Sequence, residues 1–269
     1  MNFRSKEMYI HSLMCIIGGF FGAYAIVNGF ENMGSAQTTN MIDIVCTLLG
    51  KNYFDFFLRI LAFVLYITAI AICVCLGKRT NVNTRKYAIT VEIIIMIALF
   101  FMPKSINPLV GLLPIFFMMS TQWSVFHGVG KYNSATIFST NNLKQCVIGF
   151  TEYLLDKNPE QLEKGKFYGN SLIWFHVGVA ISYFTCKEFG YMASLFAVPF
   201  SVAAFTLEVL PENIKDEVEE KIEKDIIERD ARDRNREIAP LRQAEDAYLV
   251  DTSDMTIEQV IDRIVELIG

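Results

Sequence analysis

The sequence predicts an all-α integral membrane protein with six transmembrane helices in two inverted three-helix repeats, followed by a small α(β) cytoplasmic tail. Three observations predict this fold class. The 269 residues are 52% apolar, with a mean hydropathy of +0.33, which is high for a soluble domain. Six apolar runs are long enough, or nearly so, to cross a bilayer. One sequence pattern also recurs about a hundred residues further along the chain.

The charge distribution divides the chain at Pro211. Residues 211–269 hold 18 acidic and nine basic residues, a net charge of −9, whereas residues 1–210 carry a net charge of +4. Such asymmetry is typical of segments that lie in different solvents. We therefore predict a membrane domain over residues 1–210 and a cytoplasmic tail over residues 211–269.

The six apolar runs follow one another along the membrane domain. They cover residues 8–28, 54–76, 87–102, 106–126, 167–186 and 191–209. A helix needs about 20 residues to cross about 30 Å of hydrocarbon. The third run is short and ends before Pro103, because proline cannot continue the helical hydrogen-bond ladder. The first run has the basic flank of a signal peptide but no clean cleavage site, so we expect it to be retained as a helix.

Basic residues in the loops predict the orientation, because cytoplasmic loops hold an excess of lysine and arginine. With the N-terminus inside, eleven basic residues lie on the inner side and three or four on the outer side. We therefore expect a multi-pass protein with both termini in the cytoplasm.

The repeated pattern is centred on two breaks rich in threonine and asparagine. Thr38-Thr39-Asn40-Met41 aligns with Thr140-Asn141-Asn142-Leu143 at an offset of 102 residues. Three spans per half would invert the second copy, and inverted repeats are common in transporters that bind substrates where interrupted helices meet. The predicted substrate-binding residues are Thr38, Thr39, Asn40, Thr140, Asn141 and Asn142. The alternative is that these residues only cap short interfacial helices, since threonine and asparagine are favoured N-caps.

Glu92 is a further candidate because it lies in the middle of the third apolar run. An acidic group at the bilayer centre costs roughly 3 kcal/mol, so we expect Glu92 to face the bundle interior or a polar cavity. It is either a substrate-binding or proton-relay carboxylate, or a structural hydrogen-bond partner of His11, His127 or His176. The cysteines and histidines show no ligand spacing, so we expect no metal and no cofactor.

The membrane domain resembles a known family in four short motifs. These are Gly22-Ala23-Tyr24-Ala25-Ile26, Thr38-Thr39-Asn40, Gln122-Trp123 and Thr140-Asn141-Asn142-Leu143. They are similar to motifs of the YoaK-like family of bacterial six-helix membrane proteins, some of which are described as small-molecule permeases. The resemblance covers nearly the whole domain and implies a location in the bacterial inner membrane. Ala25 stands where the family often has an aspartate.

The tail contains an arginine-rich run at residues 229–236 and ends in an apolar-faced helix that Thr256 can cap. The arginine-rich run is either a solvated, self-paired helix face or an anion site, because guanidinium groups bind phosphate oxygens in pairs. Residues 217–269 are similar to the C-terminal end of bacterial cytidylate kinases over a long, nearly gapless stretch. In those kinases the matching residues contact CMP, so the resemblance implies nucleotide-contact roles for Arg229, Asp233 and Arg236.

The sequence has no Gly-x-x-x-x-Gly-Lys-Ser/Thr loop to cradle nucleotide phosphates. We therefore expect no catalytic residues and no kinase activity from this chain alone, and interpret the tail as a fragment of a P-loop kinase acquired by gene fusion. The leading hypothesis is a YoaK-like permease or binding protein for an unknown small molecule. The alternatives are a nucleotide-binding protein related to (d)CMP kinases, with a second polypeptide supplying the ATP loop, or a membrane scaffold. Expected partners are the lipid bilayer, a small molecule, and a nucleotide or partner chain at the tail, but no nucleic acid.

Overall fold

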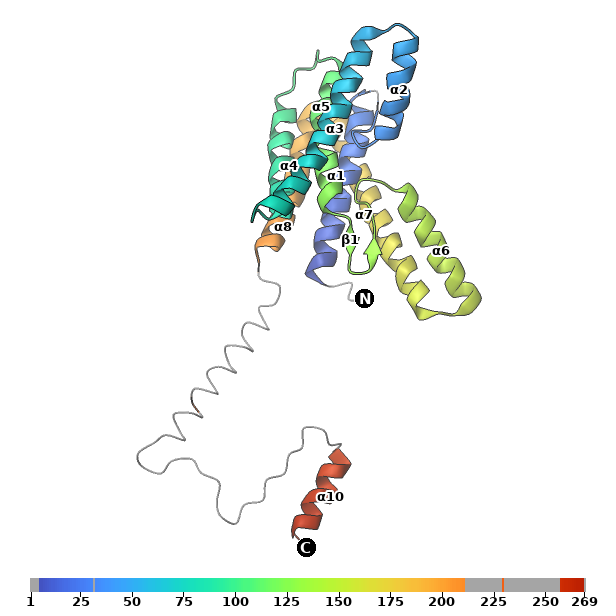
Figure 1. The fold of residues 1–269 in the computed structure, drawn as a ribbon, viewed down its shortest axis with the longest axis vertical. Helices are drawn as coiled ribbons and strands as arrows, with labels where there is room; N and C mark the ends of the chain where they lie inside the picture. The colour runs from blue at the N-terminus through green and yellow to red at the C-terminus, as the bar shows by residue number, and fades with distance from the viewer. Residues whose placement is uncertain (1–4, 31, 211–228, 230–256, 269) are drawn as a thin grey trace. The chain divides into compact units, whose positions relative to one another are not determined.

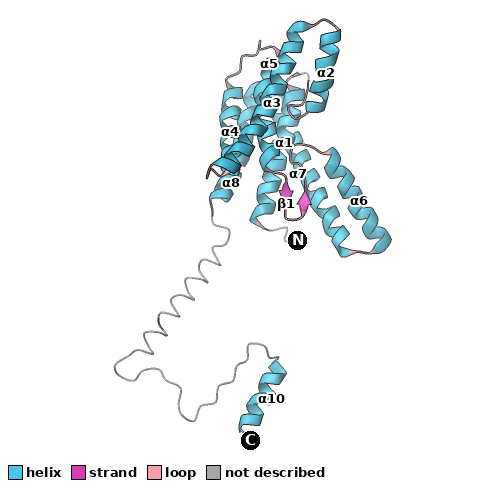
Figure 2. Ribbon diagram, viewed as in Figure 1, coloured by secondary structure: helices cyan, strands magenta, loops and turns pink. Residues whose placement is uncertain are grey.

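We analysed a computed structural model that describes residues 5–30, 32–210, 229 and 257–268 (Figure 1). The chain divides into two compact units, Met1–Leu210 and Pro211–Gly269. The first unit is built almost entirely of helices, as Figure 2 shows. In order, its elements are α1 (Lys6–Val27), α2 (Gln37–Leu49), α3 (Tyr53–Arg79), α4 (Thr84–Phe100), α5 (Pro108–Val125), β1 (Gly128–Val129), β2 (Tyr132–Asn133), α6 (Thr140–Asp156), α7 (Pro159–Phe189), the 3-10 helix η1 (Gly190–Ala197) and α8 (Val198–Val209).

Four helical segments within the described ranges are long and apolar enough to cross a membrane. They are Lys6–Val27, Tyr53–Arg79, Pro108–Val125 and Pro159–Val209. The last segment joins α7, η1 and α8, whereas α4 has only 17 residues. These helices identify a membrane protein, but helix length and composition give four candidate crossings rather than the six predicted.

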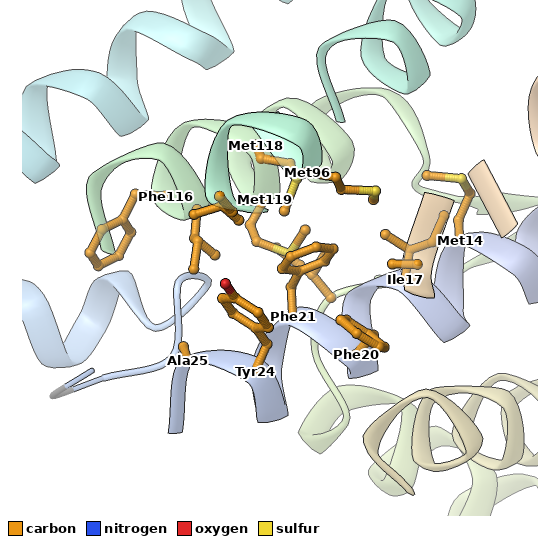
Figure 3. Close-up of a cluster of buried hydrophobic side chains, with 14 of the residues drawn as sticks. Met14, Ile17, Phe20, Phe21, Tyr24, Ala25, Met96, Phe116, Met118 and Met119 are labelled. Carbon is orange, nitrogen blue, oxygen red and sulfur yellow. The ribbon is translucent and has the colours of Figure 1, made fainter. Parts of the chain in front are cut away.

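The core of the membrane unit is built around α1. Fifteen of its 22 residues are buried, including all of 14–25. Its aromatic side chains Phe20, Phe21 and Tyr24 lie together among methionines of α4 and α5 (Figure 3). The hydroxyl of Tyr24 donates a hydrogen bond of 2.9 Å to the carbonyl of Tyr191. Because α1 is apolar on every side, it can occupy the centre of the bundle.

The long helices form two parallel pairs, α1 with α7 and α3 with α5. His11 of α1 contacts Ser171 of α7 (Nε2–Oγ 3.0 Å), and the Nδ2 of Asn28 donates to the Sγ of Cys186 further along both helices, at 3.3 Å. In the same way α3 runs parallel to α5, since Tyr66 meets Phe116 and Cys73 reaches the carbonyl of Thr121. The helices α4, η1 and α8 pack together on another side of this core.

Glycines allow α1 and α7 to approach closely. A Cβ added to Gly19 would lie 1.9 Å from the carbonyl oxygen of Phe175, and one added to Gly178 would lie 2.0 Å from that of Ile16. By contrast, a Cβ on Gly22 would meet only the tip of a phenylalanine ring, at 3.8 Å. The close contact of the two helices therefore depends on Gly19 and Gly178 and not on Gly22.

Two short helices, α2 and α6, accompany two of the long ones. Figure 1 shows α2 beside α3 and α6 beside α7, and these pairs are in contact. Both short helices leave apolar side chains exposed at matching positions of the repeat. These exposed residues are Met41, Val45 and Leu48 on α2, and Leu143, Val147 and Phe150 on α6. Such faces suit hydrocarbon rather than water.

The two ends of the membrane unit meet at a cluster of charged side chains. The ammonium of Lys6 donates to the carbonyl oxygen of Leu210 at 2.5 Å. Arg85 of α4 binds both carboxylate oxygens of Glu7 at 2.8 and 3.0 Å, and its Nε lies 3.3 Å from Glu208 of α8. The cluster joins the start of α1, the start of α4 and the end of α8.

The second unit is described only at Arg229 and over the closing helix α10 (Ile257–Ile268). The predicted closing helix is therefore present. Its side chains Ile261, Ile264 and Val265 are exposed, and Arg263 pairs with Glu266 at 2.6 Å. Arg229 is exposed, whereas Asp233 and Arg236 lie outside the described residues.

Candidate functional site

The segment just before α2 packs against the middle of α5, and the segment just before α6 packs against the middle of α1. A Cβ added to Gly34, just before α2, would lie 2.1 Å from a side-chain carbon of Ile115 in the middle of α5. A Cβ added to Gly18, in the middle of α1, would lie 2.3 Å from the carbonyl oxygen of Thr136, just before α6. Both non-helical segments are therefore packed within the bundle, where protein groups can satisfy their backbone.

Two of the predicted residues, Asn40 and Asn142, are 1% and 2% exposed. The Nδ2 of Asn40 donates to the carbonyl of Arg59 at 3.2 Å. Asn142 has more partners, which are all in the segment before α6. Its Nδ2 donates to the carbonyls of Ala135 (2.8 Å) and Phe138 (3.1 Å), and its Oδ1 accepts from Ser134 at 3.0 Å. These bonds hold the breaks in place rather than presenting the amides to a ligand.

The other four predicted residues of the breaks are exposed and line two cavities. Thr38 and Thr39 line a cavity of about 370 Å³, which we name the α2 cavity. Thr140 and Asn141 line a larger one of about 880 Å³, which we name the α6 cavity. Volumes of this order are those of small-molecule sites.

Two aromatic side chains belong to the walls of both cavities. Trp123 and Phe138 line the α2 cavity and the α6 cavity alike. Their rings stand edge to face, with centroids 5.7 Å apart and an interplanar angle of 84°. Tyr66 extends this cluster on the side of the α2 cavity, 6.4 Å from Trp123. The two breaks, about a hundred residues apart in sequence, thus converge on one aromatic pair.

The α6 cavity is also basic. Lys131 and Lys144 line it together with the amides and hydroxyl of Asn133, Gln145 and Tyr168. Lys131 donates to Glu160, and this hydrogen bond raises the pKa of the exposed lysine. No ion pair or hydrogen bond of Lys144 is found among the described residues.

The threonine and asparagine side chains of the breaks do not cap the helices. The N-cap residues are Ala36 for α2 and Ser139 for α6, and neither makes a side-chain capping bond. The capping alternative is therefore wrong.

Glu92 lies apart from both cavities. It is fully buried on α4, which packs against α5, η1 and α8. Neither carboxylate oxygen has a hydrogen-bond partner within the part of the chain that is described. His11 instead contacts Ser171, and His176 contacts the carbonyl of Leu172. The alternative of a histidine partner for Glu92 is therefore wrong, and Glu92 is not brought together with the Thr/Asn breaks.

Sequence reasoning missed the aromatic and basic walls of the cavities. Trp123 follows Gln122 in the sequence, and the Nε2 of Gln122 donates to the carbonyl of Met14 (2.7 Å) and to the hydroxyl of Thr136 (2.9 Å). Phe138 and Lys144 flank the second break, but they align with Ala36 and Ile42 of the first, so the repeat gave no signal for either residue. Across the described ranges, no group of three His, Cys, Asp or Glu residues could hold a metal ion.

Comparisons with known proteins divide the chain in the same way. A family model described as a protein of unknown function (DUF1275) matches residues 10–207, and one described as cytidylate kinase matches residues 203–269. The curated cytidylate kinase of Cupriavidus pinatubonensis is 57% identical over 47 residues, and that of Chromobacterium violaceum is 54% identical over 46. The cytidylate kinase of Thermotoga maritima is 47% identical over 49 residues.

These alignments cover 17–18% of this chain and 21–22% of the kinases. The chain thus spans about a fifth of the length of the curated relatives it matches. No solved structure matches it.

Proposed function

Since the chain belongs to the DUF1275 family, the YoaK-like family of proteins of unknown function, we propose that its membrane unit binds a small molecule and passes it across the membrane. The observation that carries this proposal is the convergence of two cavities on Trp123 and Phe138. Each cavity is lined by the start of one short helix, and interrupted helices that meet inside the bundle form the substrate sites of many transporters.

The helix pairing supports two inverted halves. The first half runs from α1 to α4, and the second from α5 to α8. The first helix of each half packs beside the third helix of the other half, as α1 does with α7 and α5 with α3. The segments before α2 and α6 also cross over, since Gly34 contacts α5 and Thr136 contacts α1. A pseudo-two-fold axis in the membrane plane would relate the α1–α7 pair to the α5–α3 pair, and the Gly34 contact to the Thr136 contact.

The path of the chain supports six crossings. In this proposal α1, α3, α4, α5 and α7 each cross, and η1 together with α8 makes the sixth crossing. Asn83, before α4, lies 3.4 Å from Glu208 at the end of α8, and Ser194 of η1 bonds Met96 further along α4. The two segments therefore run antiparallel. We assign α2 and α6 to helices that enter the bilayer without crossing it, because both have exposed apolar faces.

The meeting of Lys6 with Leu210 supports an even number of crossings, because the two ends of the membrane unit lie on one side. In this proposal that side faces the cytoplasm and the membrane is a bacterial inner membrane, because that side holds the excess of basic residues.

Thiol labelling tests whether the cavities hold water. In a variant with all six native cysteines replaced by alanine, Thr39→Cys and Asn141→Cys each place a thiol in one cavity. Val45→Cys and Val147→Cys place matched thiols on the apolar faces of the same helices. A membrane-impermeant maleimide reacts with thiolates, which form in water and not in hydrocarbon. We expect the two cavity thiols to react roughly tenfold faster than the two valine-position thiols.

Passage, rather than binding alone, requires access from both sides. We expect the reagent to reach Thr39→Cys when it is added outside intact cells, and Asn141→Cys when it is added outside inverted vesicles, whose outer surface is the cytoplasmic face of the membrane. Equal, slow labelling at all four positions would contradict the proposal and favour a membrane scaffold.

A second candidate function concerns the tail, because its similarity to cytidylate kinases is specific. We propose that the tail keeps a binding site for a nucleoside monophosphate that includes Arg229, Asp233 and Arg236. Calorimetric titration of CMP and ATP into the full chain tests it. We expect CMP to release heat that an Arg229→Ala/Arg236→Ala variant abolishes. Identical traces for the two proteins would remove this candidate and leave the tail as a remnant of the fusion.

A further inference from the structure

The lining of the α6 cavity indicates the charge of its ligand. Among the described residues, two lysines line this cavity and no aspartate or glutamate does. Lys131 is already engaged by Glu160 and lies over the ring of Tyr132, 5.4 Å from its centroid. Lys144 remains as one cation without a protein partner in the described residues. One uncompensated positive charge suits a ligand with one negative charge.

The same walls indicate the ligand's shape. The rings of Trp123 and Phe138 both line the cavity and stand at right angles to each other. The hydroxyl of Tyr168 is occupied by the carbonyl of Asn133 at 2.9 Å, which leaves its ring as a wall. Aromatic faces favour flat, unsaturated groups in stacked or edge-to-face contact. The uncharged amides of Asn141 and Gln145 can donate to further ligand oxygens.

We infer that the α6 cavity binds a flat organic monoanion, an aromatic carboxylate, with Lys144 as its charge partner and Trp123 and Phe138 as its stacking walls. This inference rests on the proposed function, since it names the class of molecule that the membrane unit takes. A phosphate monoester carries a second charge near neutral pH, and the engagement of Lys131 leaves no second unpaired cation for it among the described residues that line the cavity.

Fluorescence of Trp123 provides a direct reading of this site. The chain has two tryptophans, so a Trp174→Phe variant of the full chain leaves Trp123 as the single reporter. In detergent it is titrated with benzoate, with its neutral relative benzamide, with hexanoate and with phenyl phosphate. We expect saturable binding of benzoate, with benzamide and hexanoate each roughly tenfold weaker. Tighter binding of phenyl phosphate than of benzoate would overturn the assignment to a carboxylate.

Substitutions at the two lysines test whether Lys144 itself pairs with the ligand carboxylate, or whether any positive charge in the cavity has the same effect. We expect Lys144→Gln to weaken benzoate binding roughly tenfold and to leave benzamide binding unchanged. Lys144→Arg keeps the charge and should keep the affinity within about threefold. Lys131→Gln should have a smaller effect than Lys144→Gln. Equal affinity for benzoate and benzamide, no saturable benzoate binding, or wild-type affinity in Lys144→Gln would each overturn the inference.

The labelling experiment keeps this inference distinct from the proposed function. Fast labelling of Thr39→Cys and Asn141→Cys without benzoate binding would reject the ligand class alone. Slow labelling at both positions would reject the proposed function itself.

Discussion

At the scale of single residues, each of the two breaks contains a buried side chain beside an exposed one. Asn40 and Asn142, at equivalent positions of the repeat, are buried and bond backbone carbonyls. Their neighbours Thr39 and Asn141 are exposed in the cavities. A helix turns about 100° per residue, so adjacent residues lie on different faces of the helix. The asparagines position the break, and the residues beside them are available to a ligand.

The matched pair Asn142→Leu and Asn141→Leu tests this division. Asn142→Leu leaves the carbonyls of Ala135 and Phe138 without their amide donor, and should lower the free energy of unfolding by about 2 kcal/mol. Asn141→Leu removes an exposed amide and should change it by less than about 0.5 kcal/mol. Thermal unfolding in detergent measures both. Equal stability of the two variants would show that the Asn142 bonds do not hold the break.

At the scale of elements, α1 and α7 approach closely enough for backbone atoms to touch at two glycines. Gly19 and Gly178 each face a carbonyl oxygen of the other helix. In a membrane, helices associate through such close van der Waals contact because the surrounding lipid is as apolar as the side chains. The position of α7 in turn sets that of Tyr168, which lines the α6 cavity.

The contrast between Gly19→Ala and Gly22→Ala measures the close packing of α1 and α7. A Cβ at Gly19 would overlap the carbonyl of Phe175, so we expect Gly19→Ala to lower the free energy of unfolding by roughly 2–3 kcal/mol. The same change at Gly22 makes ordinary contact and should be neutral, or stabilising by up to about 1 kcal/mol through helix propensity. Melting temperatures in one detergent compare the two. A Gly19→Ala protein as stable as the wild type would contradict the packing described.

The charged cluster at the ends of α1, α4 and α8 offers a second test at this scale. Arg85→Met removes the paired bonds to Glu7 and the contact with Glu208. It should lower the free energy of unfolding by about 1 kcal/mol. The expected value is modest because Arg85 and Glu7 are partly exposed. Arg85→Lys should recover less than half of this loss, because an ammonium cannot bind both carboxylate oxygens in the planar geometry of a guanidinium. Thermal unfolding at low and high salt tests the assignment: the stability gap between wild type and Arg85→Met should narrow with salt.

At the scale of the whole molecule, two units of different chemistry share one chain. The DUF1275 match ends at residue 207 and the cytidylate kinase match begins at residue 203, so the two overlap within α8. The membrane unit extends to Leu210 and includes the contact with Lys6. A chain cut after this residue therefore keeps the contacts that we describe for the membrane unit.

Truncation after Leu210 should leave the membrane unit folded. We expect residues 1–210 to unfold within about 2 °C of the full chain, a change of less than about 1 kcal/mol, and to label identically at Thr39→Cys and Asn141→Cys. A truncated protein that aggregates or unfolds at much lower temperature would show that the tail contributes to the membrane fold.

The sequence by itself determined the membrane class, the change of chemistry at Pro211, the alignment of the two breaks and the similarity of the tail to cytidylate kinases. These properties depend on composition, periodicity and local order, which the chain carries without folding. Only the tertiary structure decided which residues of the breaks are buried, that Glu92 lies apart from them, and that Trp123 and Phe138 join the two cavities. Those facts depend on the rotation of each helix and on contacts between segments about a hundred residues apart. Neither can be obtained from one sequence pattern, because the same apolar helix can present any of its faces to a neighbour.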